Sequence, residues 1–142
     1  MTPCQKIKRE ILLQALENLK SFPDDAVYEN EKALLKSLER GITDETVNEQ
    51  YDALVDMDIH WDYESEFRGG TVETNLPCDY SRHYESKSVA RKLSDGSWVG
   101  WTYWYGGGKH GEPGSVQWME DAYDLEVTET EKMVLVREFK KI

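Results

Sequence analysis

The chain has 142 residues, of which 39% are hydrophobic and 32% charged, and its 28 acidic and 17 basic side chains give a formal net charge of −11 at pH 7. This length and composition are typical of one folded domain and exclude a disordered chain or a small disulfide-dependent scaffold. The excess of acid excludes direct nucleic-acid binding and docking on an anionic membrane, because both require Lys and Arg to neutralise phosphates.

Several further classes of protein do not fit the sequence. No apolar run approaches the ~18–20 residues that span a bilayer, and no charged-then-apolar leader is present. We therefore expect a cytoplasmic protein with no membrane segment. The two cysteines, Cys4 and Cys78, are too few for a disulfide framework and lack zinc-binding spacing, so we expect no bound metal or cofactor.

The N-terminal part predicts helices. Thr2 suits the N-cap of a first helix, whose apolar residues recur at helical spacing as far as Leu19. Asp24 or Asp25 is expected to cap a second helix, and Gly41 suits its C-terminal end.

A third predicted helix opens at Thr43 and carries an acidic stripe. The stripe consists of Glu45, Glu49, Asp52 and Asp56, which step by four, three and four residues. It lies opposite the apolar side of the helix and is about 16 Å long. Like charges at these spacings each cost a few tenths of a kcal/mol.

From Asp58 the pattern alternates and predicts a strand over residues 58–67. Its apolar face would hold Ile59, Trp61, Tyr63 and Phe67, and its polar face Asp58, His60, Asp62, Glu64 and Glu66. Residues 43–67 together contain nine acids and no Lys or Arg, so this segment carries −9 of the net charge of −11. The remainder of the chain is nearly neutral.

The C-terminal part predicts a sheet. Residues 82–93 and 97–105 form the clearest hairpin, because Asp95-Gly96 is a two-residue turn signal. The implied register places Ala90 opposite Trp101 and Lys87 opposite Trp104. Further strands are expected near 116–127 and 132–140. The last segment also resembles a capped helix, but its β-branched valines favour a strand.

These elements predict a single α+β domain spanning residues 1–142, mainly helical over 1–57 and mainly β over 58–142. About three N-terminal helices would pack on a mainly antiparallel sheet of four or five strands.

Two sets of residues resemble metal-binding patterns. Asp79 with Glu85-Ser86-Lys87 resembles a metal-dependent nuclease motif, but nothing in the spacing brings its carboxylates together. Asp58, His60 and Asp62 share a predicted strand face, yet alternate residues are ~6.6–6.8 Å apart and need a ligand from another element. His83 and His110 could supply one, without a spacing that argues for it.

The alternative hypothesis for the functional site is a pocket that binds a small ligand. The aromatic strand 98–105 could form a cage for a cation, and the glycine-rich loop 106–112 could cradle an anion. The residues of such a site would be Trp98, Trp104, Lys109 and His110. The loop departs from the phosphate-binding motif, since His110 stands where Ser or Thr is required. No arrangement for nucleophilic catalysis is present, so we assign no catalytic residue.

Residues 80–87 (YSRHYESK) and 98–113 (WVGWTYWYGGGKHGEP) resemble small uncharacterised proteins of bacteriophages, prophages and plasmids. The resemblance covers about a third of the chain and carries no assigned activity. It implies an accessory role, such as countering a host defence or modulating a host machine. The acidic segment lies outside it.

The acidic segment has two interpretations. An acidic face is often just solvated surface, but such surfaces normally mix both signs of charge. Rows of carboxylates can imitate nucleic-acid phosphates and attract a Lys/Arg groove. We therefore expect a non-enzymatic inhibitor of a host nucleic-acid-handling defence system, of the anti-CRISPR or anti-restriction type. Its partner-binding residues would be Glu45, Glu49, Asp52, Asp56, Asp58, Asp62, Glu64 and Glu66. The alternative is a small-ligand-binding or metal-dependent enzyme domain using residues 98–105 and 106–112.

Overall fold

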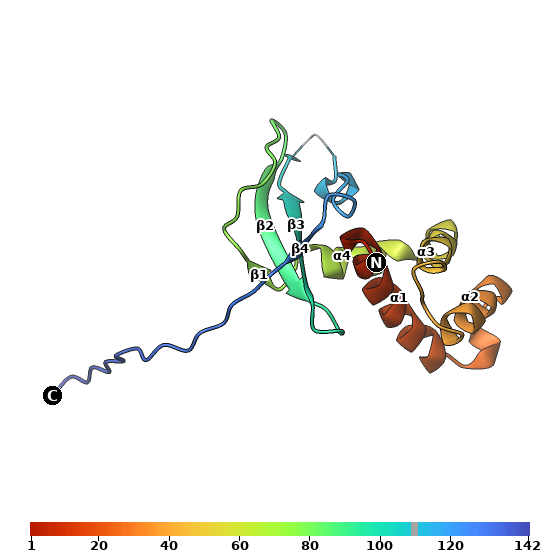
Figure 1. The fold of residues 1–142 in the computed structure, drawn as a ribbon, viewed down its shortest axis with the longest axis horizontal. Helices are drawn as coiled ribbons and strands as arrows, with labels where there is room; N and C mark the ends of the chain where they lie inside the picture. The colour runs from red at the N-terminus through yellow and green to blue at the C-terminus, as the bar shows by residue number, and fades with distance from the viewer. Residues whose placement is uncertain (109–110) are drawn as a thin grey trace.

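The computed structural model describes residues 1–108 and 111–142 and confirms the α+β class, with the helices preceding the sheet along the chain (Figure 1). The helices are α1 (Pro3–Ser21), α2 (Glu29–Glu39), α3 (Val47–Asp56) and α4 (His60–Arg68), with short 3-10 helices η1 (Asp24–Ala26) and η3 (Pro113–Ser115). The strands β1 (Val72–Glu73), β2 (Glu85–Lys92), β3 (Trp98–Tyr105) and β4 (Tyr123–Leu125) form an antiparallel sheet in the order β1-β2-β3-β4.

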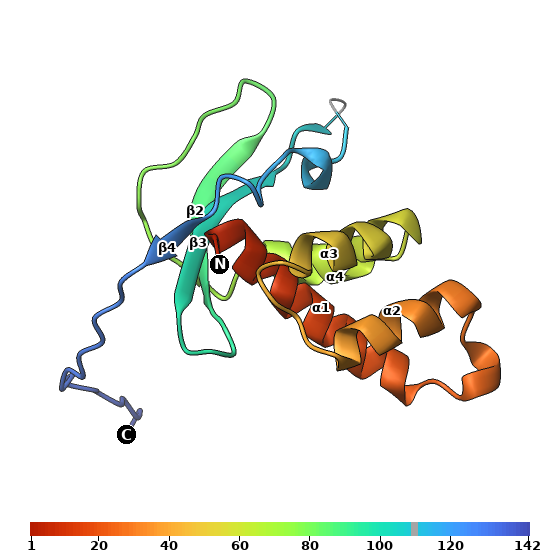
Figure 2. The same ribbon diagram turned by 45° about the vertical axis from the view of Figure 1, so that its right-hand side comes forward.

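Helix α1 begins as predicted. The Thr2 side chain accepts a hydrogen bond from the Gln5 amide, and the Gln5 side chain accepts one from the Thr2 amide, which completes a capping box. Ile7, Ile11 and Leu12 are buried on one side of the helix. This side places α1 against α2, α3 and α4, so α1 is the centre of the helical layer (Figure 2).

Helix α2 begins later than predicted, and neither Asp24 nor Asp25 caps it. Those two residues belong to η1, and the N-cap of α2 is Tyr28. The backbone amide of Tyr28 donates to the Glu31 carboxylate at 3.2 Å, so Glu31 satisfies one of the unpaired amide donors at the start of the helix.

The strand predicted over residues 58–67 is wrong, because these residues form α4. The alternation that suggested a strand also contains His60, Tyr63, Glu64 and Phe67 at helical spacing, and His60 and Phe67 are the buried residues of α4. Asp58 adopts a left-handed backbone with φ of 58° and turns the chain from α3 into α4. Trp61, predicted to face inward, is 51% exposed.

The hairpin of β2 and β3 forms, but its predicted register is shifted by one residue. Val89 lies opposite Trp101 and Ala90 opposite Gly100, where the prediction paired Ala90 with Trp101. The Leu93 amide donates to the Ser97 carbonyl at 2.8 Å, so the loop has three residues rather than two. Gly96, with φ of 88°, occupies the left-handed position that ends such a loop.

The register determines what the sheet buries. Trp101 is fully buried, stacks on Phe67 with ring centroids 5.4 Å apart, and donates its indole N–H to the Arg68 carbonyl at 2.7 Å. The ring centroid of Trp118 is 5.5 Å from that of Trp101. The Trp101 indole therefore joins the sheet to α4.

The C-terminal strands are shorter than predicted. Of residues 116–127, Tyr123–Leu125 form β4, and the strand predicted over 132–140 is wrong. Residues 126–142 lead away from the sheet without regular structure (Figure 1). The strand preference of Val134 and Val136 is not realised, because nothing in the described chain pairs with this segment.

No helix in the described part of the chain combines the length and the apolar character needed to cross a bilayer.

Candidate binding surface on α3 and α4

The predicted acidic residues lie on α3, on α4 and in the turns beside them. Seven are exposed: Glu45, Glu49, Asp52, Asp56, Asp58, Asp62 and Glu66. The eighth, Glu64, is partly buried and accepts a short hydrogen bond from the Tyr51 hydroxyl. Burial raises the pKa of Tyr51, and the bond to Glu64 raises it further, so the phenol keeps its proton and acts as the donor. Glu64 thus links α3 to α4 as well as adding charge.

None of the eight carboxylates forms an ion pair with a residue that the structure describes. Their neighbour Asp44 does so, at 3.2 Å from the Met1 amino group. The acids at positions 49, 52 and 56 follow one another along α3 without an intervening cation. The surface therefore retains its negative charge in full, at a small cost to helix stability.

The exposed acids Glu49, Asp52 and Asp56 form a ridge along α3, the α3 ridge, which runs between two hollows. On one side, Glu49 and Asp56 border a mainly apolar groove of about 490 Å³ between α2 and α3, with Leu34 and Ala53 among its lining residues. On the other side, Asp52 borders a depression of about 350 Å³ between α3, α4 and residues 114–120.

The second hollow contains groups suited to contact a partner. Trp61 is 51% exposed, and its indole N–H donates to Asp58 at 2.8 Å, which holds the ring in place. His60 lines the same hollow and is 6% exposed, yet its Nδ1 atom has no hydrogen-bond partner among the described residues. The sequence-based prediction missed both features, because the predicted strand placed Trp61 in the core and His60 on the surface. The helical spacing of His60 and Phe67 was the pattern that indicates a buried His60 and an exposed Trp61.

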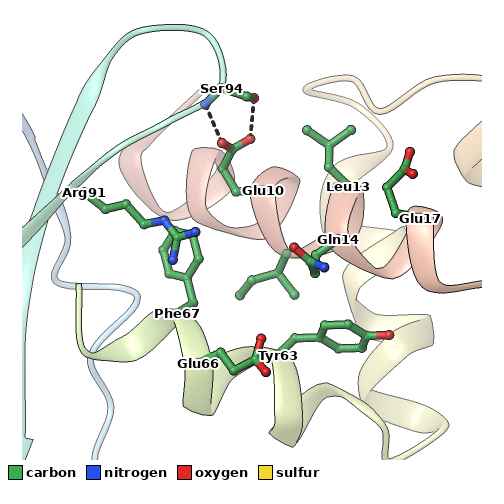
Figure 3. Close-up of a pocket in the computed structure, with 10 residues that line it drawn as sticks. Glu10, Leu13, Gln14, Glu17, Tyr63, Glu66, Phe67, Arg91 and Ser94 are labelled. Atoms are coloured by element: carbon green, nitrogen blue, oxygen red, sulfur yellow. Dashed lines mark hydrogen bonds between the residues drawn. The ribbon is translucent and has the colours of Figure 1, made fainter. Parts of the chain in front are cut away.

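The acids do not all share one hollow. Glu66 instead lines a pocket of about 240 Å³ between α1, α4 and the β2–β3 hairpin (Figure 3). There the Glu10 carboxylate accepts hydrogen bonds from the Ser94 amide and hydroxyl at 2.5 and 2.7 Å, and Arg91 stacks on Phe67. The Glu10 carboxylate of this pocket therefore ties the hairpin to α1.

The alternative ligand site is built differently from its prediction. Lys109 and His110 lie outside the described residues. Trp104 is buried, and its carbonyl accepts a hydrogen bond from Arg68 at 2.6 Å, while Trp98 is half-buried opposite Leu125. Both indoles are therefore part of the packed sheet.

The aromatic cage already holds cations of the chain itself. Tyr103 and Tyr105 stack with ring centroids 5.7 Å apart, and the Lys87 ammonium lies 5.7 and 5.6 Å from the two rings. The Arg68 guanidinium lies 4.7 Å from the Tyr103 ring. These contacts use the ring faces that an external cation would need.

The two metal patterns are not assembled. Lys87, the basic residue of the nuclease motif, pairs with Glu73 at 2.7 Å. His60 is buried, whereas Asp58 and Asp62 are exposed, so these three residues no longer share a face. Within residues 1–108 and 111–142, no three His, Cys, Asp or Glu side chains come together as metal ligands would.

Comparison with protein-family models, with curated proteins and with solved structures finds no match to this chain.

Proposed function

We propose that this chain is a non-enzymatic binding protein that docks its acidic α3–α4 surface on a basic surface of a partner protein. The observation that carries the proposal is the set of seven exposed carboxylates that have no ion pair within the described chain. Unneutralised carboxylates steer a positively charged partner and select against acidic ones.

Trp61 supports the same surface as an interface. Exposed tryptophan is enriched among residues that dominate binding energy, and this one is fixed by its bond to Asp58. An Arg or Lys side chain entering the hollow would meet the carboxylates of Asp52 and Glu64.

We further propose that the partner is a nucleic-acid-handling protein whose Lys/Arg groove accepts this surface in place of phosphates. The resemblance of residues 80–87 and 98–113 to phage and plasmid proteins favours a host defence complex as that partner. The docking residues would be Glu45, Glu49, Asp52, Asp56, Asp58, Asp62, Glu64 and Glu66.

The experiment uses the full chain, immobilised and exposed to bacterial lysate at 50 and 500 mM salt, with bound proteins identified by mass spectrometry. We expect a nucleic-acid-binding protein at the lower salt concentration and its loss at the higher one. The purified partner should then lose affinity for its DNA or RNA as this chain is added, because both compete for one groove.

The decisive variant carries Glu49→Lys, Asp52→Lys and Asp56→Lys. Its control carries Asp25→Lys, Glu39→Lys and Asp121→Lys, which changes the net charge equally at exposed positions that belong to neither α3 nor α4. The first variant should lose partner binding at least tenfold while the control retains it, with circular dichroism confirming both folds. Equal behaviour of the two variants would refute a local acidic interface.

A further inference from the structure

Residues 126–142 present apolar side chains to solvent in a way that the rest of the chain does not. Met133 and Phe139 have relative exposures of 103% and 90%, and Val134, Leu135 and Val136 of 77 to 78%. Four of these five residues are consecutive, so the run is apolar on both sides of an extended chain. A run of this kind is typical of a strand that is covered on both faces.

The charges of the same segment are divided into two blocks of opposite sign. Residues 126–131 contain three acids, Glu126, Glu129 and Glu131, and no base. Residues 132–141 contain four bases, Lys132, Arg137, Lys140 and Lys141, against the single acid Glu138. The formal charge is therefore −3 over residues 126–131 and +3 over residues 132–141, and it changes sign where the apolar run begins.

This order of charges fits a second copy of the same segment in one orientation. A parallel, in-register pair would place like charges opposite each other, which destabilises a sheet. An antiparallel pair places the acidic block of each copy against the basic block of the other. The pairing is symmetric about a two-fold axis, so a single contact surface serves both copies and the assembly closes as a dimer.

We propose that residues 128–142 form an antiparallel β-ribbon with the same residues of a second copy. With Leu135 opposite the Leu135 of the other chain, Glu129 lies opposite Lys141 and Lys132 opposite Glu138. Val134 and Val136 then face each other on the same side of the ribbon, which brings the apolar runs of both copies together at its centre. Each opposite-charge pair occurs twice because of the symmetry.

The segment follows β4, which is one of the two edge strands of the sheet. Pairing from Thr128 onward begins two residues past the end of β4 and gives hydrogen-bond partners to backbone that has none in the sheet. Because a two-stranded ribbon is weak on its own, we expect a concentration-dependent dimer with a dissociation constant in the micromolar range.

The test is sedimentation velocity of the full chain from 1 to 200 µM in a reducing buffer. The first variant, Glu129→Lys with Lys132→Glu, places like charges at every named pair and leaves the net charge unchanged. It should weaken dimerisation at least tenfold. Adding Glu138→Lys and Lys141→Glu restores opposite charges in all pairs, again without changing net charge, and should return the dissociation constant to within about threefold of the original.

A third variant separates this proposal from the proposed function. Glu49→Lys, Asp52→Lys and Asp56→Lys should leave the dimer intact, because the ribbon does not involve α3. Loss of the dimer in that variant would mean that the basic block docks on the acidic surface of another copy, and it would overturn the ribbon. A chain that remains monomeric at 200 µM, or a first variant that dimerises normally, would overturn it as well.

Discussion

At the tip of the β2–β3 hairpin, Asp95 accepts two hydrogen bonds from within the turn and one from α1. Ser97 donates its hydroxyl and its amide to Oδ1 at 2.6 and 3.0 Å, and Arg9 donates to Oδ2 at 2.7 Å. The bonds from Ser97, followed by the contact with Arg9, hold the pKa of Asp95 well below its ordinary value. The ionised carboxylate is thus favoured in the folded chain over the unfolded one.

The sign of the pH dependence follows from that lowered pKa. The stabilisation is complete above the unfolded pKa, near 3.9, and is lost as the pH falls through the lower folded pKa. We predict that Asp95→Asn lowers the free energy of unfolding at pH 7 by about 1 kcal/mol or less, because the side chain is 42% exposed and solvent screens its charge. The difference from the unmodified chain should shrink below about pH 4.

Denaturant unfolding from pH 7 to pH 2 measures this effect. Asp121→Asn is the control, since Asp121 is exposed and forms no hydrogen bond or ion pair with a described residue. A gap between Asp95→Asn and the unmodified chain that stays constant down to pH 2 would contradict the proposed origin of the stabilisation.

Among the elements, α3 bears the cost of the acidic surface. Asp52 and Asp56 are one turn apart on its exposed side, and Asp56 ends the helix, where the backbone dipole disfavours negative charge. Asp62 is in the opposite position, in the first turn of α4, where the dipole favours it. Asp56 therefore destabilises α3, whereas Asp62, six residues later, stabilises α4.

We predict that Asp52→Asn with Asp56→Asn raises the free energy of unfolding by about 0.5–1 kcal/mol at low salt, because repulsion within α3 is relieved. Asp62→Asn should lower it by about 0.3–1 kcal/mol. Urea unfolding at 20 and 500 mM salt checks both, and both differences should decrease at the higher salt concentration. The same sign for the two variants would contradict the role given to the helix ends.

Across the whole molecule, the helical layer and the sheet share their core at Trp101. This indole contacts Phe67 and Arg68 of α4 and lies beside Trp118, which follows η3. Helices and strands that share one buried core are expected to unfold together.

We predict that Trp101→Ala lowers the free energy of unfolding by about 3–5 kcal/mol. Trp61→Ala, at an exposed indole, should cost less than about 1 kcal/mol. Unfolding followed by far-ultraviolet circular dichroism and by tryptophan fluorescence should give coincident transitions in each protein. Helical signal that persists after the fluorescence transition would reveal two independent units.

Sequence patterns were sufficient where one local interaction decides a structure. The capping box of Thr2 and Gln5 and the periodic apolar residues after it define α1 without help from elsewhere. They were insufficient where two patterns coincide, because residues 58–67 satisfy both a strand and a helix period. The hairpin was found from Asp95-Gly96, but the same dipeptide also fits a three-residue loop, and that one residue shifts every cross-strand pair.

The candidate site was predictable to a similar degree. The absence of Lys and Arg from residues 43–67 is a property of the covalent chain, so its concentrated negative charge follows from the sequence. Which of those acids border a hollow does not follow, because it depends on how α3 packs between α2 and α4. The exposure of Trp61 and the unpartnered Nδ1 of His60 likewise required the fold.

The sequence by itself determined the α+β class, the helical N-terminal part and the location of the charge, since each depends on composition and on contacts between near neighbours in the chain. The tertiary structure decided the helical state of α4, the register of the sheet and the exposure of residues 126–142. The physical reason is the same in each case: these features depend on whether a residue far away in sequence, such as Trp101 beneath Phe67, is present to bury or pair with the segment. For residues 126–142 no such residue is found within the described chain, and the proposed second copy would supply it.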